Sequence, residues 1–154
     1  MKSLKSQGFT LPELLITLTI VSLLSLAAFS GWQQWQRHQR MRETALQLQQ
    51  FLHNVRAWAG WHNRDRQLWL LEGDRWCLGS GPPPPSGCRA GQRMQLLAPY
   101  PQVRIFAIEG NPGFYGRRNV ARAGHIIFGE GALRWRIIIS ARGRIRLCEV
   151  SLCR

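Results

Sequence analysis

A single carboxylate, Glu13, interrupts a run from Phe9 to Phe29 that is otherwise apolar or hydroxyl-bearing. At ~1.5 Å per residue, a helix of this length spans about 30 Å, the thickness of a bilayer's hydrocarbon core. A charge there costs roughly 2.5–3.5 kcal/mol, so an intramembrane acid indicates a function. A plain anchor leaves Glu13 unexplained, and a glutamate that snorkels to the membrane surface is the simpler alternative. A secretory signal is disfavoured, because its apolar core is usually only ~7–15 residues long.

Four cysteines lie beyond the apolar run: Cys77, Cys88, Cys148 and Cys153. An even number favours disulfides in an oxidising compartment. Three pairings are possible, and Cys77–Cys88 with Cys148–Cys153 is favoured because each pair closes a local, turn-rich loop. A zinc site is disfavoured, because neither cysteine spacing is tight and the four histidines (His38, His53, His62 and His125) are scattered.

Arginine could bind anions. The chain has 21 Lys and Arg against 8 Asp and Glu, a net charge of +13 and a pI near 11.4. Both lysines, Lys2 and Lys5, lie in the first eight residues. Candidate anion-binding residues gather near the C-terminus: Arg134, Arg136, Arg142, Arg144 and Arg146. This balance indicates nucleic acid, acidic lipid or an acidic protein surface as a partner. A merely solubilising excess of charge is the alternative.

Catalytic motifs are missing from the sequence, which has no G-x-S-x-G, P-loop or H-E-x-x-H and no paired carboxylates at useful spacing. Acids are sparse, so general acid–base chemistry has few candidates. We therefore expect no enzyme, no cofactor and no metal site. A single-pass membrane enzyme is a third functional class, and it would require a pocket with convergent polar groups.

A long helix is expected from Trp32 to Ala59, because neither Pro nor Gly interrupts this stretch. Apolar residues recur there at spacings of three and four: Met41, Ala45, Leu48, Leu52, Val55 and Ala59. We expect this stripe to pack on the β-rich part that follows, with Gly60 as the stop signal. A coiled coil is the competing interpretation.

Short strands are expected after the helix, at Gln67–Leu71, Arg75–Leu78, Met94–Leu97, Val103–Ile108, His125–Phe128, Leu133–Ser140 and Arg144–Cys148. The proline-rich stretch from Gly79 to Gly91 predicts an exposed loop, either clamped by a disulfide or serving as a polyproline ligand. Phe114 to Asn119 is expected to be a loop. Arg144 and Arg146 should project from one face of the last strand. The elements predict an α+β fold, a long helix packed on a mainly antiparallel sheet.

The N-terminal residues Gly8-Phe9-Thr10-Leu11-Pro12-Glu13 follow a basic stretch and precede a long apolar run. They resemble the prepilin signature of type IV pilins and type II secretion pseudopilins. The resemblance implies that a prepilin peptidase cuts between Gly8 and Phe9 and methylates the new terminus at Phe9. It also implies that Glu13 pairs with the terminal amine of a neighbouring subunit during assembly.

The stretch from Ile139 to Arg146, preceded by Phe114-x-Gly and Gly124-His-Ile-x-Phe, resembles the GspH/FimT family of minor pilins. Members initiate or cap type IV pili and type II secretion pseudopili. In those linked to natural transformation, a Gly-Arg-x-Arg motif is implicated in contacting DNA, and Gly143, Arg144 and Arg146 match it. Alternatively, Gly143 is a hairpin glycine and the arginines form a solvated strand face.

These resemblances imply a pilin fold with a leader (1–8), a transmembrane and assembly helix (9–30), a periplasmic amphipathic helix (31–60) and a β-rich domain with two disulfides (61–154). The implied partners are prepilin peptidase, other major and minor pilins or pseudopilins, and the inner membrane, with DNA in the alternative function. The N-terminus would be cytoplasmic and the remainder periplasmic, before transfer to the tip of a pilus or pseudopilus.

Overall fold

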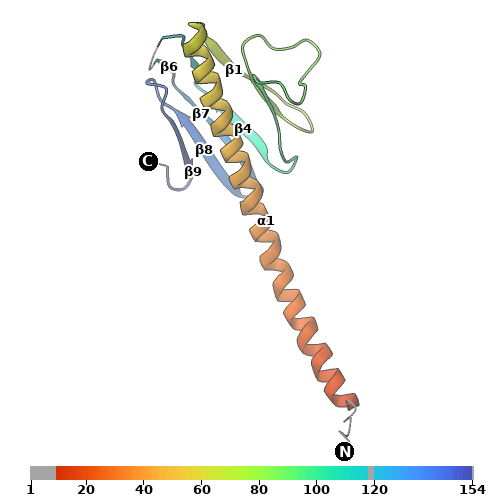
Figure 1. Cartoon of the computed structure of the whole chain (residues 1–154). Coiled ribbons are helices and arrows are strands. Elements are labelled where there is room, and N and C mark those ends of the chain that lie inside the picture. The colour runs from red at the N-terminus through yellow and green to blue at the C-terminus, as the bar shows by residue number, and fades with distance from the viewer. Residues whose placement is uncertain (1–9, 118–119, 154) are drawn as a thin grey trace, which may run out of the picture. The chain divides into compact units, whose positions relative to one another are not determined.

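The computed structural model of the chain describes residues 10–117 and 120–153, and it describes residues 27–30 by their backbone alone. Within those ranges the chain forms one helix, α1 (Leu11–His62), followed by strands (Figure 1). The strands are β1 (Arg66–Leu71), β2 (Cys77–Ser80), β3 (Gln95–Leu97), β4 (Arg104–Glu109), β5 (Gly113–Phe114), β6 (Ala121–Arg122), β7 (Gly124–Glu130), β8 (Leu133–Ile139) and β9 (Ile145–Glu149). The expected α+β fold is confirmed. The chain divides into two compact units, Met1–His38 and Gln39–Arg154.

The strands of the second unit form two antiparallel sheets, where the sequence had indicated one. A five-stranded sheet has the order β3-β2-β1-β5-β6, and a four-stranded sheet has the order β4-β7-β8-β9. The two-residue strand β5 includes Phe114, the first residue of an expected loop, and the two-residue strand β6 follows that stretch. Neither strand is long enough to show a period of two. Backbone pairing, as between Phe114 and Ala121, defines them instead.

Strand β2 begins at Cys77, two residues later than expected. Arg75 and Trp76 belong to the connection, where the indole N–H of Trp76 donates to the carbonyl of Val103 over 2.7 Å. Gly79, expected to open a loop, instead lies within β2 opposite Trp69. A Cβ atom at Gly79 would lie 2.1 Å from the Trp69 ring, so only glycine fits beneath this indole.

Helix α1 continues two residues beyond Gly60, the expected stop, and ends at His62. Asn63 follows with a φ of 49°, in the left-handed region that asparagine tolerates. The backbone N–H of Arg64 then donates to the carbonyl of Ala59 over 3.2 Å, which is the long bond of a Schellman ending. The asparagine, not the glycine, therefore ends the helix.

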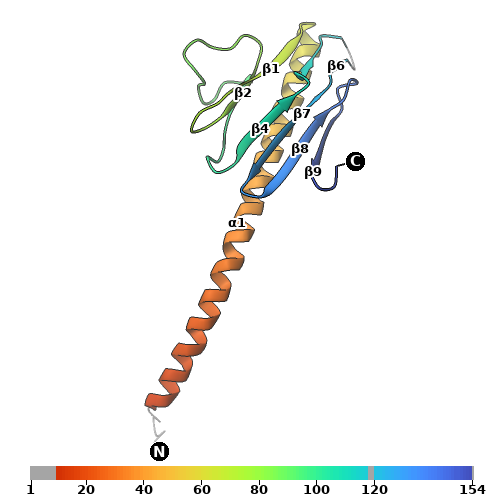
Figure 2. The same cartoon turned by 180° about the vertical axis from the view of Figure 1, so that it is seen from behind.

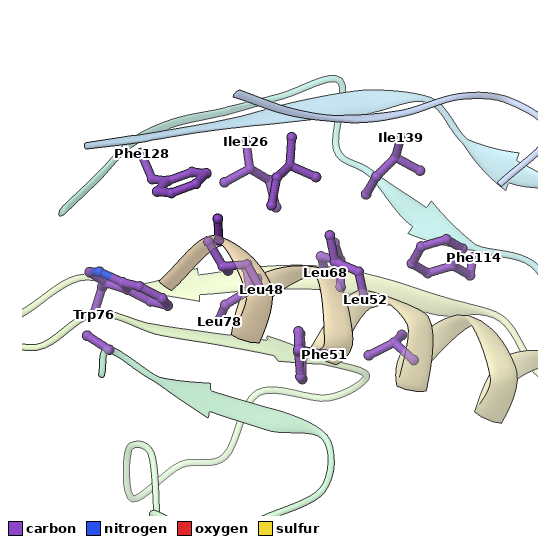
Figure 3. Packing of buried hydrophobic residues seen from close by; sticks show 14 of the residues in the cluster. Leu48, Phe51, Leu52, Leu68, Trp76, Leu78, Phe114, Ile126, Phe128 and Ile139 are labelled. Atoms are coloured by element: carbon purple, nitrogen blue, oxygen red, sulfur yellow. The ribbon is translucent and has the colours of Figure 1, made fainter. Parts of the chain in front are cut away.

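The core of the second unit lies between α1 and the sheets. Figures 1 and 2, seen from opposite sides, show the later part of α1 lying over one face of the four-stranded sheet. All six stripe residues from Met41 to Ala59 are fully buried, which confirms the predicted apolar face. In Figure 3, Leu48 and Leu52 lie between Phe128 and Ile139 on one side and Leu78 on the other.

Two polar contacts also hold the helix. The guanidinium of Arg40 donates to both carboxylate oxygens of Glu130, over 3.0 and 2.6 Å, and these hydrogen bonds raise the pKa of Arg40. The phenol of Tyr100 donates to the carboxylate of Glu43, which raises the pKa of Tyr100 above its ordinary value. Helix α1 is thus tied to β7 and to the loop after β3.

Two disulfides, Cys77–Cys88 and Cys148–Cys153, complete the second unit. The first closes the proline-rich loop that follows β2, and the second joins β9 to the residues just beyond it. Each spans a short stretch of chain, 11 and 5 residues.

Truncation of the stripe should cost far more than truncation of the helix's exposed side. We expect Leu52→Ala to lower the free energy of unfolding by about 2–5 kcal/mol, because it leaves a cavity beneath a fully buried side chain. Leu46→Ala is the matched control, since Leu46 is 57% exposed on the same helix and its loss should cost within about 0.5 kcal/mol. Urea unfolding of the full chain in a nonionic detergent measures both. Equal losses in the two variants would contradict this account of the core.

Candidate functional site

The first turn of α1 carries Glu13. Gly8 and Phe9, the expected processing residues, lie outside the described residues. Pro12 is the second residue of the helix, where a missing backbone N–H costs nothing. An acid in the first turn also interacts favourably with the helix dipole. Glu13 is exposed, and in the sequence it is the only ionisable side chain between Thr10 and Gln36.

The surface of α1 after Glu13 is apolar and satisfies its own polar groups. Leucine, isoleucine and valine side chains from Leu14 to Leu26 are about half exposed or more. The hydroxyls of Thr17, Thr19, Ser22 and Ser25 each donate to a carbonyl one turn earlier, over 2.7–2.9 Å. No hydroxyl there needs water, which is what hydrocarbon demands. By length and composition, this helix can cross a membrane.

At the other end of the chain, the β8–β9 hairpin turns through Ser140 to Arg144. The N–H of Gly143 donates to the carbonyl of Ser140 over 2.8 Å, and the N–H of Ser140 donates to the carbonyl of Arg144 over 3.0 Å. Gly143 has a φ of 71°, which an L side chain rarely adopts. The glycine of the Gly-Arg-x-Arg sequence therefore has a structural role, whatever the arginines bind.

Three of the candidate arginines, Arg142, Arg144 and Arg146, line one groove of about 880 Å³. The α1 residues His53 and Arg56 also line this groove, together with apolar and hydroxyl groups of the hairpin. None of the lining residues is acidic. A Cβ atom at Gly143 would lie 3.3 Å from Nε of Arg56, so glycine also leaves room for this guanidinium beside the turn. We refer to this surface, lined by His53, Arg56, Arg142, Arg144 and Arg146, as the arginine groove.

Arg134 and Arg136, the other two candidates, do not line the arginine groove. The guanidinium of Arg134 lies 3.4 Å above the Phe106 ring and donates to the carbonyl of Gly131 over 2.7 Å. Arg136 is paired with Cys148 in the sheet, and its Nε is buried without a hydrogen-bond partner among the described residues. The five arginines thus divide into a cluster at the turn and two separate side chains on β8.

Sequence reasoning missed His53 and Arg56. Each directly follows a residue of the buried stripe, Leu52 or Val55, so both lie at the margin of the packed helix face. That position could have been recognised in the sequence. A residue beside the buried stripe of a helix lies next to the element that packs on the stripe. Only the fold, however, identifies the β8–β9 turn as the neighbour.

Among the described residues, no group of three or more His, Cys, Asp or Glu could hold a metal ion. All four cysteines form disulfides. The apolar part of α1 offers a partner hydrophobic surface, and the arginine groove offers it cations.

Residues 3–29 match the family model of the prokaryotic N-terminal methylation motif. The match spans Gly8, Phe9 and Glu13 and most of the apolar part of α1. No curated protein and no solved structure matches the chain significantly.

The methylation motif and the fold together define a type IV pilin-like protein, with a long N-terminal helix whose later part packs on antiparallel sheets. Such a protein is a substrate of prepilin peptidase and assembles with other pilins. It is a structural subunit and not an enzyme.

Proposed function

We propose that this chain is a minor pilin or pseudopilin that helps to initiate or cap a type IV pilus or a type II secretion pseudopilus. The observation that carries the proposal is the methylation motif, which lies at the start of a helix that continues into the core of a β-rich domain. A helix of this kind can be held in the membrane first and in a fibre later, since its apolar surface suits both lipid and neighbouring subunits.

The proposed maturation begins at the inner membrane. Cleavage between Gly8 and Phe9 removes residues 1–8, and Phe9 is methylated. Residues 9–30 form the transmembrane and assembly helix, residues 31–60 the periplasmic helix and residues 61–154 the β-rich domain. An N-terminus in the cytoplasm places the four cysteines in the periplasm, where disulfides persist.

The specific role as a minor subunit rests on resemblance to the GspH/FimT family. In the structure, two glycines of the resembling segments lie at close contacts. A Cβ atom at Gly116 would lie 2.4 Å from the backbone of Asn63, and one at Gly124 would lie 2.3 Å from the carbonyl of Glu109. Three further segments, Trp61–Asp65, Trp76–Leu78 and Gly143–Cys148, resemble the enterobacterial prepilin peptidase-dependent protein A.

Processing should be visible by mass. Co-expression with a prepilin peptidase is expected to remove Met1–Gly8 and add one methyl group to the new N-terminus at Phe9. Gly8→Val should leave the chain at full mass, because a branched side chain then stands at the cleavage site, whereas Ala27→Val is a control outside that site. Intact-mass spectrometry of the purified chains measures this. An uncleaved wild-type chain in the presence of active peptidase would refute the proposal.

Assembly should depend on the charge of Glu13. We expect Glu13→Gln to be cleaved and methylated normally but to be recovered in sheared fibres at least several-fold less than wild type, because it has no carboxylate to pair with a neighbour's N-terminal amine. Thr17→Val, one turn away, is the control that changes polarity without removing a charge. Normal recovery of Glu13→Gln would show that the acid has another role.

A second candidate function, DNA binding during DNA uptake, is favoured by one observation. The arginine groove is lined by Arg142, Arg144 and Arg146 together with Arg56, and none of its lining residues is acidic. Guanidinium groups bind phosphate through paired N–H donors, and contacts to phosphate need no base sequence. The alternative is that the same arginines only keep a strand face solvated.

A salt series separates these alternatives. For duplex DNA and the full chain in nonionic detergent, Arg144→Gln combined with Arg146→Gln should lower affinity and reduce the slope of log K against log salt by about 2, one unit per lost phosphate contact. Arg93→Gln with Arg104→Gln is the matched control, since both residues are exposed and neither lines the arginine groove. If the two double variants behave alike, net charge and not the motif binds DNA.

A further inference from the structure

A second hollow adjoins the arginine groove at the end of α1. It has a volume of about 550 Å³ and shares His53 and Arg56 with the groove, so the two are continuous. Its other lining residues come from the last turns of α1 and from the segment between β5 and β6: Ala57, Gly60, Trp61, Tyr115, Arg117 and Val120. We call this surface the aromatic hollow.

Backbone hydrogen bonds hold the two surfaces side by side. The N–H of Ala121 donates to the carbonyl of Ala141 in the β8–β9 turn over 2.8 Å. The N–H of Tyr115, just after β5, donates to the carbonyl of Val120, just before β6, over 3.2 Å. Figures 1 and 2 both show β6 beside the end of α1. The arginines of the turn and the aromatic rings thus belong to one surface.

The aromatic hollow presents two exposed aromatic rings. Trp61 is 86% exposed and Tyr115 is 38% exposed. The neighbouring Trp58 contrasts with them, because it stacks on His62 at 4.0 Å and lies beneath the guanidinium of Arg66 at 3.6 Å. No such ring contact occurs for Trp61 among the described residues. An exposed indole beside a row of cations can serve as a stacking platform.

We propose that the arginine groove and the aromatic hollow together bind single-stranded nucleic acid. Phosphates lie along Arg144, Arg146 and Arg56, while unpaired bases stack on Trp61 and Tyr115. This inference rests on the second candidate function and narrows its ligand. A duplex offers phosphates but keeps its base faces stacked on one another, so only an unpaired strand can use both parts of the surface. An acidic protein segment would bind the guanidinium groups through its carboxylates, but those carboxylates would not stack on the aromatic rings.

The experiment compares ligands that differ only in their bases. The full chain in nonionic detergent is titrated with an oligothymidylate of about 12 nucleotides and with an abasic deoxyribose-phosphate chain of the same length. We expect wild type to bind the oligothymidylate more tightly. Trp61→Ala should weaken oligothymidylate binding roughly 5-fold or more, the effect of one lost stack, and leave abasic binding unchanged. Trp61→Phe should restore part of the loss. Leu46→Ala is the control for removal of an exposed apolar side chain on the same helix.

Each other outcome counts against the inference. If wild type binds the oligothymidylate and the abasic chain equally tightly, or if Trp61→Ala has no effect on oligothymidylate binding, bases do not stack on Trp61. Polyglutamate that competes as well as oligothymidylate identifies a general anion groove and overturns a nucleic-acid site. Duplex DNA that binds through Arg144 and Arg146 as tightly as the oligothymidylate does overturns this inference and leaves the second candidate function standing. Failure to bind any nucleic acid removes both, while the assembly function is unaffected.

Discussion

Burial of one stripe of α1 is the interaction on which the second unit depends. Six side chains from Met41 to Ala59 lose all contact with water, and residues of both sheets surround them. At roughly 1.5–3 kcal/mol for each large side chain, this burial outweighs any single polar contact in the unit. The arginine groove also depends on it, because His53 and Arg56 face the hairpin only while Leu52 and Val55 are packed.

Much of this arrangement could be predicted from the sequence, because it depends on apolar residues that recur at short, regular spacings. The stripe repeats every three or four residues and β8 alternates over seven, so both follow from local geometry. The two disulfides are the local pairs that the sequence favoured. The methylation motif is likewise local, which is why residues 8–13 indicated a pilin-like chain before any fold was known.

What could not be predicted depends on contacts distant in sequence. In the sequence, Gly79 resembles a loop residue. In the fold it lies in β2, where the indole of Trp69 from the adjacent strand covers it. The strands β5 and β6 exist through pairing alone, and they extend the sheet that contains β1, which is separate from the four-stranded sheet. Arg56 was missed for the same reason, because nothing in the helix sequence states that Gly143 will lie beside it. Arg134 does not line the arginine groove, and its guanidinium lies over the ring of Phe106 on β4.

Strand β9 is an open edge of the four-stranded sheet, and this position gives its arginines a further consequence. An unpaired edge is a template on which a second chain can add a strand. Arg144 and Arg146 are exposed at the start of this edge, and the Cys148–Cys153 disulfide closes a short loop at its end. Charged side chains on an edge strand are a common way to disfavour the addition of a further strand. Arg144 and Arg146 thus lie on the sheet edge as well as in the arginine groove, so one pair of side chains serves two surfaces.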